Sequence, residues 1–179
     1  RGEYHFFMHH SPKHHCIMGT DYYVTNEQRV TADGKIQPAG EILGYEAITR
    51  EYYERYGLPV MHTETNLPQG PDGDEAVYWL HKVWANVLRL RNDGIPIVGF
   101  TWFSLTDQID WDIALRENKG TLNPLGLFDL NRNLRPVGEA YRELIADWRQ
   151  VLPTQSVCLT LPLRFPNGTT QTHPETTFH

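Results

Sequence analysis

The chain has 179 residues, of which 40% are hydrophobic, and it carries a formal net charge of −6 with a pI near 5.8. These values are those of a globular protein with one domain, long enough to bury a substantial core. The acidic balance and the lack of a basic stripe argue against nucleic-acid binding, and no apolar run approaches the roughly 20 residues of a membrane span.

The first sixteen residues contain five histidines and one of the two cysteines, which raises the question of a metal site. Histidine-rich tracts can bind metals. A zinc site, however, needs ligands on a defined scaffold, and residues 11–13, Ser-Pro-Lys, are typical of a plain loop. We therefore expect neither a metal nor another cofactor. For Cys16 and Cys158, two buried free thiols are favoured over a disulfide.

The two ends of the chain differ in character from its middle. The sequence starts at Arg1 without a signal peptide, so we expect that its beginning lies elsewhere, in a cytoplasmic protein. Strand-like and helix-like patterns alternate up to residue 152, whereas residues 153–179 are rich in Thr and Pro and have no helical period. We expect an extended surface tail there. Its Asn167-Gly168-Thr169 triplet fits a glycosylation pattern that also arises by chance.

The first strand-like and helix-like segments follow the histidine-rich tract. Residues 17–24 predict a strand that ends in polar and aromatic residues, and residues 25–35 predict a long turn-rich connection. A helix is expected to begin at Pro38, which is a favourable first helical residue. Its apolar positions, at helical spacing, are Ile42, Leu43, Ala47, Ile48, Tyr52 and Tyr56.

The stretch that organises the rest of the chain is residues 58–66, Leu-Pro-Val-Met-His-Thr-Glu-Thr-Asn. It predicts a short buried strand that stops at the carboxylate of Glu64. The preceding helix ends at Gly57, a suitable C-cap, and a breaker-rich loop at residues 67–74 leads into the next helix. Parallel α/β proteins place their chemistry at the carboxyl ends of such strands, so Glu64 is a candidate functional residue.

The remaining elements repeat this alternation. A helix is expected over residues 74–91, and its Trp79 and Trp84 are interpreted as packing residues rather than as a ligand groove. A third strand, apolar enough to be covered on both faces, is expected over residues 95–102. A long polar and aromatic loop at 103–123 is of the length that usually has a function. A short strand at 125–130 and a last helix at 136–152 complete the pattern.

Polar and aromatic residues follow all three strands at the same end of the predicted sheet. The first strand ends with Asp21, Tyr22 and Tyr23, the second ends with Glu64, and the third is followed by the loop that contains Gln108. Aromatic faces beside carboxylates and amides suit a sugar ring. Taken alone, Glu64 is better explained as a solvated loop acid. The coincidence of three consecutive βα units favours a carbohydrate site instead.

Two motifs make the resemblance specific. Thr63-Glu64-Thr65-Asn66 resembles the Thr-Glu-Asn-Gly motif of glycoside hydrolase family 1, the β-glucosidase family of (β/α)8 barrels, in which the Glu is the nucleophile at the end of strand seven. Residues 19–23 resemble the strand-six segment of that family, with Asp21 in place of Asn. By position, Tyr23 matches the tyrosine that hydrogen-bonds the nucleophile.

Residues 99–111 match the strand-eight segment of the same family without a gap. Asp110 stands where the family has a sugar-binding Glu. Phe103 falls on the family's tryptophan and Trp102 lies one place early, so the sequence leaves open which of the two lines the pocket. These departures indicate a distant relative with a different sugar preference.

The resemblance implies an α/β fold in which residues 1–152 are the last three βα units of a TIM barrel. It also implies a retaining β-glycosidase with Glu64 as nucleophile and Tyr23 as its orienting partner. The implied substrate-binding residues are Asp21, Trp102, Gln108, Asp110 and Trp111. The expected ligand is a carbohydrate, with no nucleic-acid or membrane partner.

A complete barrel takes about 250 residues or more. The resemblance therefore implies that the other barrel half, with its acid/base Glu after an Asn on strand four, lies in the same or another chain. Asn26-Glu27 imitates that dipeptide but follows the strand-six match, so it is not expected to be the acid. The alternative function is that of a catalytically inactive barrel portion that binds carbohydrate or another protein.

Overall fold

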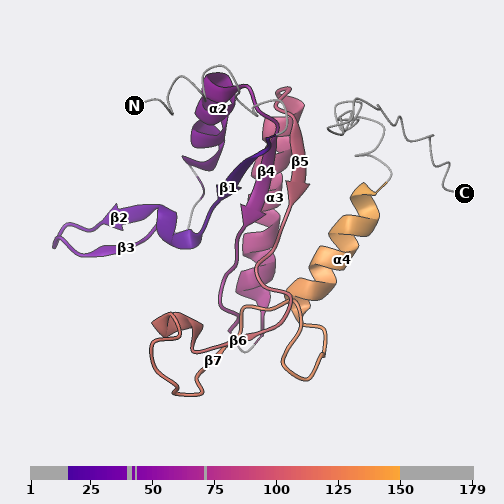
Figure 1. The fold of residues 1–179 in the computed structure, drawn as a ribbon. Coiled ribbons are helices and arrows are strands. Elements are labelled where there is room, and N and C mark those ends of the chain that lie inside the picture. Colours follow the sequence, from indigo (N-terminus) through magenta and orange to yellow (C-terminus); the bar gives the residue numbers. More distant parts are fainter. Residues whose placement is uncertain (1–15, 40–41, 43, 71, 150–179) are drawn as a thin grey trace, which may run out of the picture.

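The computed structural model describes residues 16–39, 42, 44–70 and 72–149 (Figure 1). Its centre is a parallel sheet of three strands, β1 (Met18–Asp21), β4 (Val60–Glu64) and β5 (Ile97–Phe100), in the spatial order β1-β4-β5. Each strand is followed along the chain by one helix: α2 (Gly44–Tyr56), α3 (Asp74–Asn92) and α4 (Pro136–Trp148). This is the predicted succession of three βα units.

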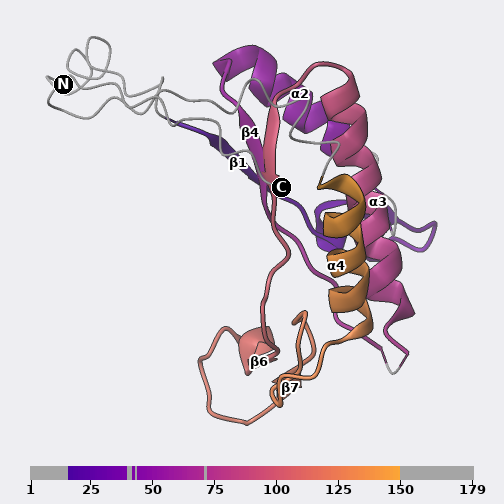
Figure 2. The same cartoon turned by 90° about the vertical axis from the view of Figure 1, so that its right-hand side faces the viewer.

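The three helices lie together on one side of the sheet (Figure 2). The side chains of Val60 and His62 in β4 are fully buried, whereas those of Met61 and Thr63 between them are only partly buried. Because successive strand residues face opposite sides, one face of β4 packs against the helix layer. The described residues leave the other face more open, and Asp21 and Thr63 lie on this open side.

Helix α3 is the main contributor to the core, as its helical apolar pattern predicts. Full burial of an aliphatic or aromatic side chain contributes about 1.5–3 kcal/mol to stability. The buried residues of α3 therefore hold the helix layer against the sheet. Trp79 and Trp84 are among its buried residues, which confirms their interpretation as packing residues. The buried residues of α3 are Ala76, Trp79, Leu80, Val83, Trp84, Val87 and Leu90.

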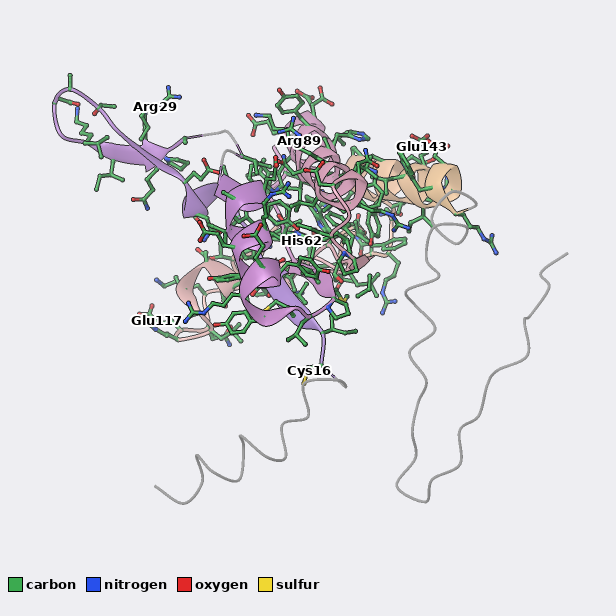
Figure 3. The ribbon with its side chains drawn as sticks, turned by 90° about the horizontal axis from the view of Figure 1, so that it is seen from above. Cys16, Arg29, His62, Arg89, Glu117 and Glu143 are labelled. Atoms are coloured by element: carbon green, nitrogen blue, oxygen red, sulfur yellow. The ribbon has the colours of Figure 1, made fainter. Side chains whose placement is uncertain are left out.

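The segment between β1 and α2 differs from the prediction. Pro38 ends a strand, β3 (Ile36–Pro38), which pairs antiparallel with β2 (Gln28–Val30), and the helix begins only at Gly44. Seen from above, this hairpin projects away from the packed centre (Figure 3). All of its strand residues are exposed, so the sequence has no alternation of buried and exposed residues that would predict these two strands. The expected start of the helix at Pro38 was therefore wrong.

The buried face of α2 also differs from the prediction. Tyr45 and Thr49 face the core, whereas Ile48, Tyr52 and Tyr56 are about 40% exposed. The expected apolar stripe was thus assigned to the wrong side of the helix. The sequence is ambiguous here because two neighbouring stripes both carry large side chains.

The segment after β5 contains small elements that the sequence did not predict. A short antiparallel pair, β6 (Gln108–Ile109) with β7 (Leu122–Asn123), encloses a 3-10 turn, η3 (Trp111–Ile113). Residues 125–130 do not form the expected strand, since Phe128 makes only isolated bridges with Thr106 and Leu134.

Several expectations fall outside the described residues: the histidine-rich tract, Cys158, the glycosylation triplet and the tail after residue 152. Cys16 is described and is exposed rather than buried. In the part of the chain that the structure covers, no group of three or more His, Cys, Asp or Glu side chains is arranged to hold a metal ion. No helix in that part is long and apolar enough to span a membrane.

Candidate active site

Glu64 and Asp21 end two neighbouring parallel strands. The strand register pairs Asp21 with Glu64, after an irregularity between Thr20 and Asp21. The backbone N–H of Tyr22 donates to the carbonyl oxygen of Glu64 at 3.0 Å. These contacts place the two acids, and the two tyrosines that follow β1, at the carboxyl ends of the strands, as predicted from the sequence.

The Tyr23 phenol lies within interaction distance of the Glu64 carboxylate. Burial raises the pKa of the Tyr23 phenol well above its ordinary value, and the hydrogen bond to Glu64 and the negative charges of Glu64 and Asp21 raise it further. The phenol therefore stays protonated and acts as the donor. Its backbone is held by a second contact, because the Tyr23 N–H donates to Asn26 Oδ1 at 2.6 Å.

Asp21 is exposed beside this pair and accepts a hydrogen bond from the Thr63 hydroxyl. Gly19 lets β1 and β4 approach closely, since a Cβ at this position would lie 2.9 Å from Thr63 Cγ2. Thr63 was not singled out from the sequence. Its position next to Glu64 in a strand that ends on an acid was the available signal.

The backbone that follows Glu64 is held in place by contacts with α3 and with the segment after β5. Thr65 is fully buried, and its hydroxyl accepts the indole N–H of Trp79 at 2.8 Å. The Thr65 carbonyl accepts the backbone N–H of Phe103 at 2.9 Å, which ties this segment to the one after β5. The direction in which Glu64 leaves the strand is thus fixed by α3 on one side and by the Phe103 segment on the other.

The two aromatic residues after β5 face different surroundings. Trp102 is 4% exposed, and its indole N–H donates to the Leu125 carbonyl at 3.0 Å. Phe103 is partly exposed, and its ring centroid lies 5.4 Å from that of Trp111, which is itself exposed. Phe103 therefore takes the accessible position that the sequence left open between them. Trp102, which was predicted to contact substrate, is a core residue.

Asp110 holds its own loop together. Its carboxylate accepts the backbone N–H groups of Lys119 (2.9 Å), Gly120 (2.9 Å) and Thr121 (2.7 Å). Burial acts to raise the pKa of Asp110, but these backbone donors outweigh it, and the pKa is lowered. Acids in loops are usually exposed, but Asp110 is only 4% exposed.

Asp107 and Gln108 likewise make contacts within the segments that follow β5. Asp107 is buried and forms a two-point ion pair with Arg135 at the start of α4, with Nε at 3.0 and 3.1 Å from its two oxygens. It also accepts the backbone N–H of Gly126 at 3.0 Å. The Gln108 amide donates to Ser104 Oγ at 3.2 Å and to the Thr106 carbonyl at 3.0 Å.

Glu27, the acid of the Asn26-Glu27 dipeptide, has a structural position. Its carboxylate accepts the Tyr22 hydroxyl and the backbone N–H of Gly44 at 2.9 Å. Gly44 is the first residue of α2, where unpaired N–H groups and the helix dipole favour an acid. Glu27 therefore anchors this helix to the end of β1.

The predicted site residues thus fall into two groups. Asp21, Tyr23 and Glu64 are brought together by β1 and β4. Gln108, Asp110 and Trp111 belong to the loop after β5, and among the described residues their hydrogen bonds join them to that loop rather than to Glu64. The sequence could not decide whether Phe103 or Trp102 is accessible, because a one-residue change of register moves a side chain to the other face of a strand.

Comparisons with known proteins agree with this architecture. No protein-family model matches the chain. A β-galactosidase of Sulfolobus acidocaldarius is 27% identical over 103 residues, which cover 56% of this chain and 20% of the β-galactosidase. The fold matches a β-glucosidase of Thermotoga maritima in complex with noeuromycin, with a TM-score of 0.51 and 16% identity. That match covers 73% of this chain and 34% of the β-glucosidase.

The same β-glucosidase in complex with galacto-hydroximolactam gives a TM-score of 0.53 at 15% identity, again over 73% of this chain and 34% of the other. The chain therefore spans about a fifth of the length of the β-galactosidase and about a third of that of the β-glucosidase. Sequence similarity relates this chain to a β-galactosidase, and its described residues form a portion of the TIM-barrel fold found in family 1 β-glucosidases.

Proposed function

We propose that this chain forms strands six to eight of a retaining β-glycosidase, in which Glu64 is the nucleophile. The observation that carries the proposal is that Tyr23 and Glu64 lie together at the carboxyl ends of two paired parallel strands, where the Tyr22 N–H donates to the Glu64 carbonyl and the Tyr23 phenol interacts with the Glu64 carboxylate. In TIM-barrel enzymes this end of the strands holds the catalytic residues. A partly buried phenol that stays protonated orients the carboxylate for attack on an anomeric carbon.

The mechanism needs a second carboxyl group. In retaining glycosidases the two carboxyl groups lie about 5–5.5 Å apart, and the second protonates the leaving oxygen. Among the described residues, Asp21 accepts the Thr63 hydroxyl and Glu27 anchors α2, so neither is proposed as this acid. We assign the acid/base role to another part of the barrel, in the same or another chain.

The proposed sugar contacts come from the segment after β5 and from the end of β1. Phe103 and Trp111 offer aromatic faces to the C–H face of a sugar, and Gln108 and Asp21 offer polar groups. Asp110 acts by holding this loop in place. Trp102 is left out of the proposed contacts because it is buried and its N–H is already bonded.

A mechanism-based label tests the nucleophile. The complete protein is incubated with 2-fluoroglycosides of several β-linked sugars, and the labelled peptide is identified by mass mapping. We expect a covalent label on Glu64, lost in Glu64→Gln and retained in Asp21→Asn. A label on another residue would overturn the assignment. Binding of glycosides without any label or hydrolysis would support the inactive carbohydrate-binding alternative.

A further inference from the structure

We propose that Gln69 is a positioning residue, which sets the place of Phe103 relative to Glu64. Gln69 follows Glu64 by five residues, in the loop after β4. It acts through residues 124–127, which are bonded both to that loop and to the segment after β5. The inference rests on the proposed function, in which Glu64 is the nucleophile and Phe103 contacts the sugar.

Gln69 is bonded to residues 124–127 by both its backbone and its side chain. Its N–H donates to the Pro124 carbonyl at 3.0 Å, and its Nε2 donates to the Gly126 carbonyl at 2.9 Å. The residue is 7% exposed, so water competes little for these bonds. The Gly126 N–H in turn donates to Asp107 Oδ1 at 3.0 Å. A Cβ on Gly126 would lie 2.3 Å from the Asp107 nitrogen, so this glycine packs directly against the segment after β5.

Both chain neighbours of Phe103 are bonded to the same stretch. The indole N–H of Trp102 donates to the Leu125 carbonyl at 3.0 Å, and the Ser104 carbonyl accepts the Leu127 N–H at 3.0 Å. Because Phe103 lies between these two anchors, a shift of that stretch moves its ring as well.

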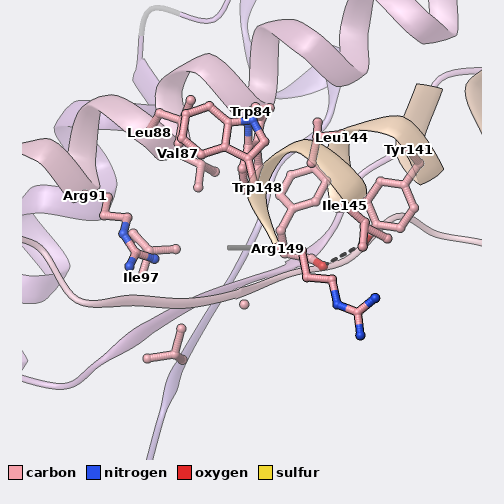
Figure 4. Close-up of a pocket in the computed structure, with 13 residues that line it drawn as sticks. Trp84, Val87, Leu88, Arg91, Ile97, Tyr141, Leu144, Ile145, Trp148 and Arg149 are labelled. Atoms are coloured by element: carbon pink, nitrogen blue, oxygen red, sulfur yellow. Dashed lines mark hydrogen bonds between the residues drawn. The ribbon is translucent and has the colours of Figure 1, made fainter. Parts of the chain in front are cut away.

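The end of β5 is held by separate contacts. At the wall of the apolar groove between β5 and α4, the Tyr141 hydroxyl donates to the Phe100 carbonyl at 2.9 Å (Figure 4). One residue further on, the Thr101 N–H donates to the His62 carbonyl at 2.9 Å. Neither bond involves the stretch that Gln69 holds. We therefore expect a change at Gln69 to act beyond Thr101 while β5 keeps its place.

The unpaired oxygen of the Gln69 amide argues against a role in stability alone. Gln69 Oε1 is buried and has no hydrogen-bond partner among the described residues. A buried acceptor without a partner lowers stability. An apolar side chain of similar length would lose the bond to Gly126 but would also remove this unpaired oxygen, so the two effects on stability oppose each other. What the amide adds is the fixed direction of its bond to Gly126.

Gln69→Met tests this role in the complete enzyme, because it keeps the length of the side chain and removes the donor. With nitrophenyl β-glycosides as substrates, we expect kcat/KM to fall by about 10-fold or more, since a displaced contact group slows the reaction. The urea concentration at the midpoint of unfolding should change little. Gln37→Met makes the same change at an exposed position of β3 and should behave like the wild type.

A double-mutant cycle shows whether Gln69 acts through Phe103. In the Phe103→Ala background the ring is already absent, so Gln69→Met should cause little further loss of kcat/KM. Equal losses from Gln69→Met in the two backgrounds would mean that Gln69 acts independently of Phe103, and would overturn the proposal.

Amide hydrogen exchange reads the position of Phe103 without any activity, because its N–H donates to the Thr65 carbonyl in the loop after β4 at 2.9 Å. In Gln69→Met we expect faster exchange at Phe103 and an unchanged rate at Thr101. Gln69→Asn, which withdraws the donor by one methylene, should do the same and takes the place of Gln69→Met if that variant fails to fold. Unchanged exchange at Phe103 would overturn the proposal. A wild-type protein that neither hydrolyses glycosides nor takes a label on Glu64, but whose exchange at Phe103 still responds to Gln69→Met, would refute the proposed function and leave the positioning role standing.

Discussion

The phenol of Tyr23 and the carboxylate of Glu64 lie together at the carboxyl ends of two neighbouring parallel strands. Neither residue is positioned by its own strand alone. Tyr23 is held by Asn26 in the following 3-10 turn, and the backbone after Glu64 is held by the Trp79 contact to Thr65. This pair is therefore preorganised by groups that do not touch the ligand in the proposed mechanism.

Removing the phenol hydroxyl tests this relationship. We expect Tyr23→Phe to lower kcat/KM of the complete enzyme by about 10- to 100-fold, because a hydrogen bond to a charged group contributes about 1.5–3 kcal/mol. The free energy of unfolding should change little, since Tyr23 is only partly buried. Asn26→Ala, which loosens the turn but keeps the hydroxyl, should show a smaller loss. Unchanged kinetics in Tyr23→Phe would remove this residue from the proposed mechanism.

The sequence predicted those parts of the fold that depend on local periodicity and burial. The strand that ends at Glu64 and the helix after it were predicted within about two residues, because buried apolar groups repeat there with one clear period. The start of α2 was not predicted, because Pro38 suits both a helix start and an edge strand. Nothing in the local sequence distinguishes these two uses.

The candidate site was predictable to the extent that it depends on strand ends. Asp21, Tyr23 and Glu64 follow directly from the positions at which β1 and β4 stop. The surroundings of Trp102 and Asp110 depend instead on contacts 9 to 23 residues away along the chain. Such contacts are set by how the later loop folds back, so a sequence pattern could not show that one is a core residue and the other a loop anchor.

His62 gives a prediction for pH. It is fully buried between Tyr45 and Phe100, with ring centroids at 5.3 and 4.9 Å, and neither ring nitrogen has a hydrogen-bond partner among the described residues. Burial lowers the pKa of His62 from about 6.5 to about 4, against the opposing effect of Asp21. The unfolded chain therefore binds the proton more strongly, and stability falls as the pH decreases from about 6.5 to about 4.

The loss over this window should be about 3 kcal/mol, since each pKa unit corresponds to about 1.4 kcal/mol. Urea unfolding followed by tryptophan fluorescence at a fixed protein concentration measures it. His62→Leu removes the titrating group and should show a flatter dependence in the same window. If wild type and variant lose stability in parallel, other groups cause the acid sensitivity and His62 does not.

The Asp107–Arg135 pair gives a prediction for stability at neutral pH. The Asp107 side chain is fully buried, so Arg135→Ala leaves a carboxylate without its charged partner. We expect this change to lower the free energy of unfolding by about 3–5 kcal/mol, as for other buried ion pairs that lose one member. Arg142→Ala breaks an exposed pair with Glu139 and should cost less than about 1 kcal/mol. If both variants lose a similar free energy of unfolding, the buried pair stabilises the fold no more than the exposed pair does.

The last prediction concerns Asp110, whose carboxylate accepts three backbone N–H groups from residues 119–121. In Asp110→Ala these donors lose their acceptor, so hydrogen exchange at Lys119, Gly120 and Thr121 should become faster. Asp110→Asn keeps one acceptor oxygen and should give an intermediate rate. Asp112→Ala is the control, because Asp112 is exposed in the same loop and the three backbone N–H groups donate to Asp110 instead.

In the complete enzyme, Asp110→Ala should also lower kcat/KM by about 100-fold, because a misplaced contact residue can cost this much even when the change lies outside the reacting atoms. The two measurements separate two roles for the residue. A loss of activity together with faster exchange means that Asp110 acts by holding the loop that carries Gln108 and Trp111. A loss of activity with unchanged exchange in Asp110→Asn would mean that its carboxylate binds the sugar directly, and unchanged activity in every variant would remove this loop from the site.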